Sequence, residues 1–251
     1  MNLSEANFPT NPKEIFLKDY SPCHYRIHKT DLFFDLYDSY AEVTASLSIE
    51  RDSNAATKTL TLTGKNLELQ KVCWNGRQLT ASEYKVSDSA LSLELKEDRG
   101  TLQTVVRIYP QKNTALEGLY RSGKMFCTQC EAEGFRKITY YLDRPDVMSE
   151  FTTRIVADKS KYPVLLSNGN RIAVGNLDDG RHWAEWHDPF LKPCYLFALV
   201  AGDLVSVDDE FETMSGRRVD LKIFVESKDA DKVAHAMRSL KKNFTSSTTL
   251  S

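Results

Sequence analysis

The sequence lacks long apolar runs and an excess of charge of either sign, and both absences exclude classes of function. The longest apolar stretch, Tyr195 to Ala201, falls far short of the roughly 20 residues that a membrane-spanning helix needs. Lysine and arginine number 33 against 35 aspartate and glutamate residues, so the formal net charge is −2. A chain this balanced has no electrostatic footprint for nucleic acid or a membrane surface, and we expect neither as a partner.

Targeting and disulfide signals are missing as well. The first twenty residues carry acidic side chains and no apolar stretch typical of a secretory signal, which predicts a cytoplasmic protein. The five cysteines, at positions 23, 73, 127, 130 and 194, are odd in number and scattered, which predicts reduced thiols. With 251 residues and 41% hydrophobic content, the chain can bury a core without disulfides or metal.

Period-two alternation of apolar and polar residues dominates the first two hundred positions. Val43, Ala45, Leu47 and Ile49 stand two apart, as do the leucines at 60 and 62 and at 91, 93 and 95. Turn residues such as Asn75-Gly76 separate these runs. Further strands are predicted at 103–109, 151–157, 181–187 and 194–200. The pattern indicates a mainly β fold, a saddle-shaped antiparallel β-sandwich, over residues 1–203.

A different pattern begins near residue 204. Residues 211–225 read as a β-hairpin around Ser215-Gly216, and Val233, Met237, Leu240 and Phe244 recur at helical spacing. The polar tail 245–251 offers no packing stripe, and one hairpin with one helix cannot close a core. We therefore expect residues 204–251 to be the truncated start of a second domain.

Metal and nucleotide motifs are absent. None of the five histidines lies in H-E-x-x-H, and His24 and His28 lead into a strand pattern, which favours surface histidines over zinc ligands. Cys127 and Cys130 have C-x-x-C spacing but no second pair, which favours free thiols. Glycine-rich phosphate loops and the G-x-S-x-G nucleophile motif are also missing. No catalytic or metal-ligating residue is predicted in this chain.

Residues 113–147 hold an unusual concentration of polar, acidic and aromatic side chains without strand alternation. A long irregular segment inside a strand-rich domain is typical of a functional loop. Glu131 and Glu133 would lie on one side of an extended stretch, so a glycosidase that uses both is one hypothesis. The alternative for the charged side chains here is an ion-pair network that holds the loop, formed by Glu133, Arg136, Asp143 and Arg144.

The same segment resembles a known family. N-T-A-L-E-G-L-Y at 113–120, C-T-Q-C-E-A-E-G-F-R at 127–136 and I-T-Y-Y-L-D-R-P-D-V at 138–147 are similar to bacterial aminopeptidase N, a gluzincin zinc metallopeptidase. K-Y-P-V-L-L-S-N-G-N at 161–170 and D-P-F-L-K-P-C-Y-L-F-A-L-V-A-G-D at 188–203 continue the likeness.

The resemblance implies an N-terminal saddle-shaped β domain followed by the start of a thermolysin-like catalytic domain. It also implies that Gln129 and Glu131 bind the free α-amine of a peptide substrate. A carboxylate makes a charge-assisted hydrogen bond with an ammonium group, worth about 1.5–3 kcal/mol, and an internal peptide would leave it unpaired.

The family's G-A-M-E-N and H-E-x-x-H motifs do not occur in these 251 residues. Zinc is therefore implied for the full-length family and no cofactor is predicted for this chain, which we expect to be inactive alone. Its partner would be a peptide N-terminus, bound together with the catalytic domain, and an exposed inter-domain surface would promote self-association. The alternative is a stand-alone, non-catalytic β module that binds a protein or carbohydrate partner.

Overall fold

The computed structural model describes residue 14, residues 16–53, residue 55 and residues 57–246. Strands dominate it and form four sheets, of eight, four, three and two strands. The predicted mainly β architecture is confirmed. The first thirteen residues and most of the predicted polar tail, from residue 247 onward, lie outside the described residues.

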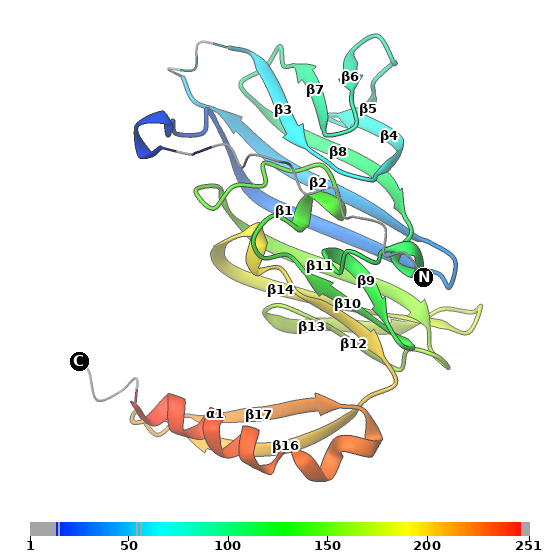
Figure 1. Ribbon diagram of the computed structural model, residues 1–251, viewed down its shortest axis with the longest axis vertical. Helices are drawn as coiled ribbons and strands as arrows, with labels where there is room; N and C mark the ends of the chain where they lie inside the picture. The colour runs from blue at the N-terminus through cyan, green and yellow to red at the C-terminus, as the bar shows by residue number, and fades with distance from the viewer. Residues whose placement is uncertain (1–13, 15, 54, 56, 247–251) are drawn as a thin grey trace, which may run out of the picture.

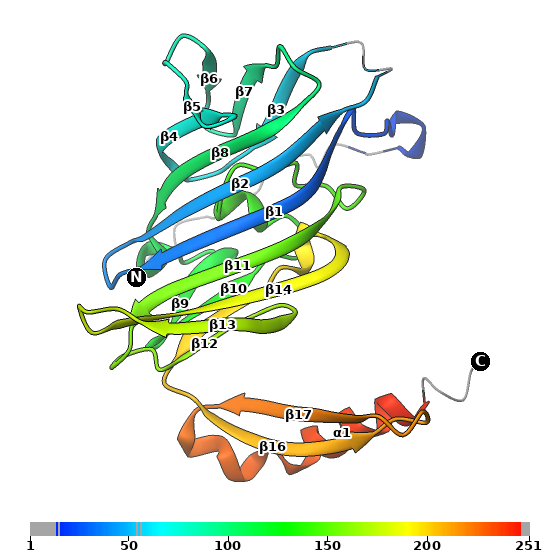
Figure 2. The ribbon, with the colours of Figure 1, turned by 180° about the vertical axis from the view of Figure 1, so that it is seen from behind.

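The eight-stranded sheet contains strands that lie between residues 25 and 193 of the sequence (Figure 2). Its order is β13 (Asn170–Asn176), β14 (Arg181–Pro193), β11 (Met148–Asp158), β1 (Tyr25–Leu36), β2 (Ala41–Arg51), β8 (Arg99–Ile108), β4 (Glu68–Trp74) and β5 (Arg77–Gln78). Neighbours pair antiparallel except β1 and β11, which are parallel. This pair departs from the predicted antiparallel sheet; parallel strands need a long connection, and residues 37–147 supply it.

Two smaller sheets cover one face of the large sheet, as Figure 1 shows in front view. One contains β12 (Val164–Ser167), β15 (Leu199–Gly202), β10 (Met125–Gln129) and β9 (Gly118–Ser122); the other contains β3 (Thr59–Thr63), β7 (Ala90–Glu94) and β6 (Tyr84–Val86). Four short 3₁₀ helices accompany these sheets. η1 (Leu17–Asp19) precedes β1, and η2 (Pro110–Lys112), η3 (Phe135–Lys137) and η4 (Cys194–Leu196) lie in the connections between strands. The hydrophobic core lies between these layers.

Alternation of the sequence becomes alternation of burial in the strands. In β2 the side chains of Ala41, Val43, Ala45, Leu47 and Ile49 are buried, and each intervening polar residue is partly exposed. The turn between β4 and β5 uses Asn75 and Gly76, with φ of 50° and 80°. Two consecutive residues with positive φ suit the tight hairpin turn that Asn-Gly predicts.

Two predicted segments differ in the structure. Residues 194–200, predicted as a strand, begin with η4, and only Leu199 onward forms β15. The thiol of buried Cys194 donates to the Asp143 carboxylate, which holds this turn away from the sheet. Residues 113–147, predicted to lack strands, contain the β9–β10 hairpin, whose ladder pairs Met125 with Ser122 through Gln129 with Gly118.

The last described elements form a separate small unit. β16 (Val205–Glu212) and β17 (Arg218–Val225) make the two-stranded sheet, followed by η5 (Ser227–Lys232) and α1 (Ala234–Ser246). The hairpin turn carries Gly216 at φ 77°, as the sequence predicts. Phe244 of α1 stacks on Phe211 of β16 with ring centroids 5.3 Å apart. The division at residue 203 into two domains stays a prediction.

No helix in the described part of the chain is long and apolar enough to cross a membrane.

Candidate functional site

The segment that carries Gln129 and Glu131 leaves the end of β10 as a tight turn. Gln129 is the last residue of the strand and its side chain is exposed, and Glu131 follows two residues later, also exposed. Cys130 between them is 2% exposed and belongs to the core. The turn closes through the amide of Gly134, which donates to the carbonyl oxygen of Cys130 at 2.8 Å. Because the side chain of Cys130 is anchored in the core, the side chains of Gln129 and Glu131 on either side of it are directed to solvent.

Two glycines let the backbone pack closely around this turn. A Cβ at Gly134 would lie 2.4 Å from the carbonyl oxygen of Gln129 and 2.9 Å from the amide nitrogen of Gly118. Gly118 pairs with Gln129 in the hairpin and has φ 73°, a conformation that a side chain rarely tolerates. Larger residues at either position would push Gln129 out of place.

The carboxylate of Glu131 has no hydrogen-bond or ion-pair partner among the described residues. Its backbone carbonyl accepts a hydrogen bond from Nε2 of Gln129 at 3.3 Å, which brings the two side chains to the same turn. The peptide bond that follows Glu131 is cis. An exposed, unpaired carboxylate beside a carboxamide is an arrangement that accepts hydrogen bonds from a cationic ligand.

A buried carboxylate holds the base of the turn. The side chain of Asp143 is 2% exposed, and its Oδ2 accepts from Nε of Arg136 at 2.8 Å and from the Arg136 amide at 3.1 Å. Its Oδ1 accepts from the thiol of Cys194 at 3.1 Å. Nη1 of Arg136 also pairs with Oε2 of Glu133 at 3.0 Å. These contacts form the ion-pair network that the sequence predicts for Glu133, Arg136 and Asp143.

Arg144 holds the other end of the segment. Its guanidinium binds Asp146 with two nitrogens, at 2.8 and 2.7 Å, and donates to the carbonyl oxygen of Ser21 at 2.7 Å. The Tyr20 hydroxyl donates to Asp146 at 3.0 Å. The Arg144 hydrogen bond holds the pKa of Asp146 below its ordinary value. Arg144 thus fastens the segment to the chain that precedes β1.

Aromatic rings lie directly beneath the turn. Phe135, one residue after Gly134, is fully buried, and its ring centroid lies 4.9 Å from Tyr141 and 5.4 Å from Phe197. The Tyr141 hydroxyl hydrogen-bonds to Thr30 of β1 at 3.0 Å, and burial raises the pKa of Tyr141. Edge-to-face aromatic packing of this kind makes a rigid base. The exposed turn is therefore attached directly to the packed core, which holds it rigidly.

The cysteines near the turn are free thiols, as the sequence predicts. Burial raises the pKa of Cys130 to about 12, and it raises the pKa of Cys194 further, with the Asp143 carboxylate adding to both shifts. Reactive cysteines have lowered pKa values, so Cys130 is a packing residue and not a redox centre.

The described residues offer no cluster of three or more His, Cys, Asp or Glu side chains that could hold a metal ion. Nε2 of His28 lies 2.7 Å from Oε2 of Glu50 on the exposed face of the sheet. Glu133 is engaged by Arg136, so it does not stand ready as the second carboxylate of a glycosidase. The glycosidase hypothesis gains no support from these contacts.

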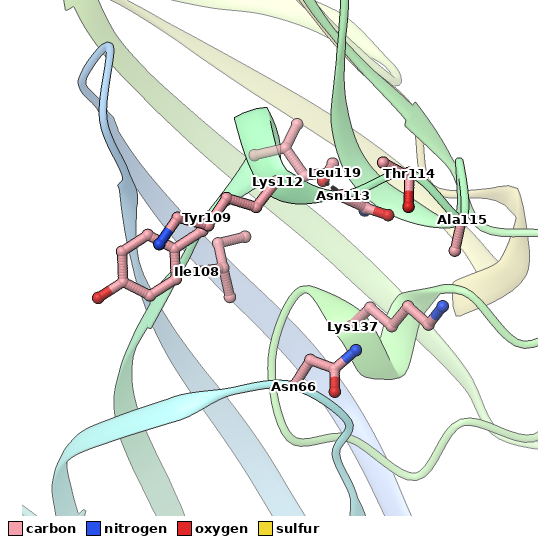
Figure 3. Close-up of a pocket in the computed structure, with 9 residues that line it drawn as sticks. All are labelled: Asn66, Ile108, Tyr109, Lys112, Asn113, Thr114, Ala115, Leu119 and Lys137. Carbon is pink, nitrogen blue, oxygen red and sulfur yellow. Dashed lines mark hydrogen bonds between the residues drawn. The ribbon is translucent and has the colours of Figure 1, made fainter.

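A pocket of about 310 Å³ lies beside the segment, next to strand β9. Figure 3 shows Asn113, Thr114 and Leu119 on one side of it and Asn66 with Lys137 on the other. Nζ of Lys137 pairs with the carboxylate of Glu117. The side-chain amide of Asn113 donates to the carbonyl oxygens of Glu117 and Leu119. The pocket holds no carboxylate or histidine, so it lacks a general acid or base.

Comparison with known families shows which protein family contains this turn. The profile of the Peptidase M1 N-terminal domain matches residues 21–196. The chain belongs to this family. The match includes Gln129, Glu131 and the residues that hold them, and it confirms the family likeness seen in the sequence.

Relatives with established names agree with this family. The chain is 51% identical over 231 residues to aminopeptidase N of Caulobacter vibrioides and 50% identical over 230 residues to aminopeptidase N of Escherichia coli. Each match covers 92% of this chain and 26% of the relative, so the chain spans about a quarter of the length of these proteins.

Solved structures share the fold. Aminopeptidase A of Legionella pneumophila, solved with aspartic acid, superposes with a TM-score of 0.84 at 32% identity, over 90% of this chain and 27% of that one. An M1 zinc metallopeptidase from Deinococcus radiodurans gives a TM-score of 0.69 at 14% identity, over 81% of this chain and 48% of that one. The second likeness concerns the fold alone.

Several contacts that build the turn cannot be read from local sequence patterns. Asp143 and Cys194 are 51 positions apart, and the contact between them follows from the meeting of η4 and the loop before β11. Gly118 and Gly134 are too widely spaced to form a motif, and their role follows from close backbone packing. The residues themselves stand in the stretches that resemble the family, which is the one signal that could have found them.

Replacement of Asp143 by alanine tests whether this carboxylate holds the turn. Arg136 is largely buried, so loss of its partner should lower the free energy of unfolding by about 3 kcal/mol. Glu133→Ala removes the other carboxylate from the same arginine, but Glu133 is 68% exposed, and we expect a loss below about 1 kcal/mol. Urea unfolding measures both; equal losses would show that Asp143 has no special role.

Proposed function

We propose that this chain is the substrate-recognition part of a zinc aminopeptidase and that Gln129 and Glu131 bind the free α-amine of a peptide substrate. The observation that carries the proposal is the exposed carboxylate of Glu131, which lacks a partner among the described residues and stands on a rigid turn. Membership of the M1 family and the aminopeptidase names of the relatives support it.

The chemistry follows from the charges of the two groups. A peptide N-terminus is an ammonium ion that donates up to three hydrogen bonds, and Glu131 together with the amide oxygen of Gln129 can accept them. An internal peptide amide has no positive charge, so it would leave the carboxylate without compensation. Recognition of the ammonium ion therefore selects chain ends over internal bonds and sets the register of the peptide.

The catalytic step needs groups that the described residues do not provide. The Deinococcus relative is named an M1 zinc metallopeptidase, and a zinc ion in the full-length protein would supply a polarised water for hydrolysis. Its ligands would come from outside the described residues, among which no ligand set that fits zinc exists. The contribution of this chain is to bind and orient the substrate amine.

Apolar side chains are exposed close to the turn. Phe190 and Leu191 of β14 are 78% and 61% exposed, and Met148 and Leu196, at the neighbouring strand start and 3₁₀ helix, are each 50% exposed. Asp188 and the buried Lys192 form an ion pair at 2.8 Å that flanks Phe190 and Leu191. Exposed apolar patches mark interaction surfaces. In the proposed function this patch meets the catalytic part of the protein.

A chimera tests amine binding. In Escherichia coli aminopeptidase N, the aligned residues would be replaced by this chain, and the parent chimera must hydrolyse aminoacyl substrates. Loss of the charge in Glu131→Gln should lower kcat/KM roughly 10- to 100-fold, because one charge-assisted hydrogen bond is lost. Glu133→Gln makes the same chemical change two residues away and should leave kcat/KM nearly unchanged. Full activity of Glu131→Gln would contradict the proposal.

The isolated chain, supplied with zinc, is expected to release no product from an aminoacyl chromogenic substrate, because no zinc ligand set exists among its described residues. The same assay on the parent chimera is the positive control. Turnover by the isolated chain that disappears in Glu131→Ala would overturn the expectation and assign catalysis to this chain itself.

The isolated chain is also expected to self-associate through the exposed apolar patch. Sedimentation velocity over a range of concentrations should show oligomers that the double substitution Phe190→Ser and Leu191→Ser reduces. Met214→Ser is the matched control, since Met214 is 77% exposed in the turn of the β16–β17 hairpin. A chain that stays monomeric at high concentration would argue against this surface.

A further inference from the structure

A second pocket, of about 280 Å³, lies at the opposite edge of the large sheet from β5. Its walls are β12 on one side and the β13–β14 hairpin on the other, and Phe224 of β17 contributes from the small C-terminal unit. Figure 1 shows β17 running below β12 and β13. The pocket has no part in the amine-binding turn.

The walls of the pocket are fixed to each other by hydrogen bonds. Trp186 of β14 donates from Nε1 to the carbonyl oxygen of Leu165 in β12 at 3.1 Å. Nε2 of His182 donates to the carbonyl oxygen of Tyr162 at 2.7 Å. These two bonds flank residues 163 and 164 and fix the position of β12 relative to β14. A preformed pocket loses little entropy when it binds.

The interior of the pocket is apolar. Leu165 and Ala184 are buried, Val164 and Leu166 are half-buried, and Val174, which is 60% exposed, lies at the open side of the pocket. Ligand pockets combine such an apolar interior with a few polar groups that fix orientation, and this volume lies at the small end of their range. The size suits a small organic molecule and not a folded partner.

A β-bulge places Arg171 on the face of β13 that lines the pocket. The register between β13 and β14 shifts between Arg171 and Ala173, so Arg171 stands opposite Trp186 and Val174 opposite Ala184. Trp186 and Ala184 are two residues apart and share the face that packs on β12. Without the bulge, Arg171 and Val174 would point to opposite faces; with it, they share one face.

The charged groups at the pocket are all basic. Lys159, Arg171 and His182 line it, and no carboxylate does. The Arg171 guanidinium has no ion-pair or hydrogen-bond partner among the described residues, and Nζ of Lys159 binds the neutral Asn176 side chain at 2.9 Å. An exposed guanidinium at the edge of a partly apolar pocket, with no carboxylate of the lining to neutralise it, is complementary to an anion that carries its own apolar body.

We propose that this pocket binds a small organic carboxylate, with the carboxylate on Arg171 and Lys159 and the apolar body between β12 and Val174. Benzoate and hexanoate are suitable probes. Titration calorimetry should show saturable binding of either probe, and the neutral amides benzamide and hexanamide should bind at least about tenfold more weakly, because they cannot form the charge-assisted bonds. Acetate, which lacks the apolar body, should also bind weakly.

Arg171→Gln should weaken probe binding at least about tenfold. Arg171→Lys should retain part of the affinity. The matched control is Arg218→Gln, which removes an arginine at the start of β17 that is 75% exposed, pairs with Glu210 of β16 and does not line the pocket. Circular dichroism checks that each variant folds, and both arginines are exposed enough for that to be expected.

Absence of saturable binding by the wild-type chain would overturn the proposal. Equal binding of acids and amides, or equal affinity of wild type and Arg171→Gln, would overturn it as well. None of these outcomes involves Glu131, so the amine-binding proposal is tested separately.

Discussion

One buried carboxylate, that of Asp143, is the constraint on which the candidate site depends. A carboxylate removed from water must be neutralised and hydrogen-bonded, or it destabilises the fold. Asp143 meets this condition with the guanidinium and amide of Arg136 and the thiol of Cys194. Because these partners belong to the turn after β10 and to the end of β14, satisfying one charge joins two distant parts of the chain at the place where Gln129 and Glu131 are displayed.

The acidic residues of this segment divide according to their surroundings. Asp143 is buried and fully engaged, and Glu133 is exposed and paired with Arg136. Glu131 is exposed and has no partner in the portion of the chain that the structure describes. The carboxylates of Asp143 and Glu133 therefore stabilise the segment, and the carboxylate of Glu131 is left available to a ligand. The difference lies in position. Glu131 follows the buried Cys130 on a turn whose close packing requires Gly134, and within the described part of the chain no cation pairs with it.

The two proposed recognition regions rely on different balances of forces. At the turn, a carboxylate in contact with solvent would distinguish a charged chain end from a neutral amide, and most of the energy of binding would come from charge-assisted hydrogen bonds. At the pocket beside β12, apolar lining residues would supply part of the energy and Arg171 the orientation. The rigid sheet that both share explains how loops and edges of one domain can carry separate tasks.

Sequence by itself determined the strand-rich fold, because alternation such as that of Val43 to Ile49 has one stable solution, a sheet with one buried face, and because Asn75-Gly76 permits the positive φ angles of a tight turn. It also led to Gln129 and Glu131, through resemblance and not through spacing. Tertiary structure alone decided the rest. The pairing of β10 with β15 and the turn at Cys194 depend on contacts between residues far apart in the chain. The face on which Arg171 lies depends on one bulged residue. Local patterns carry no record of either.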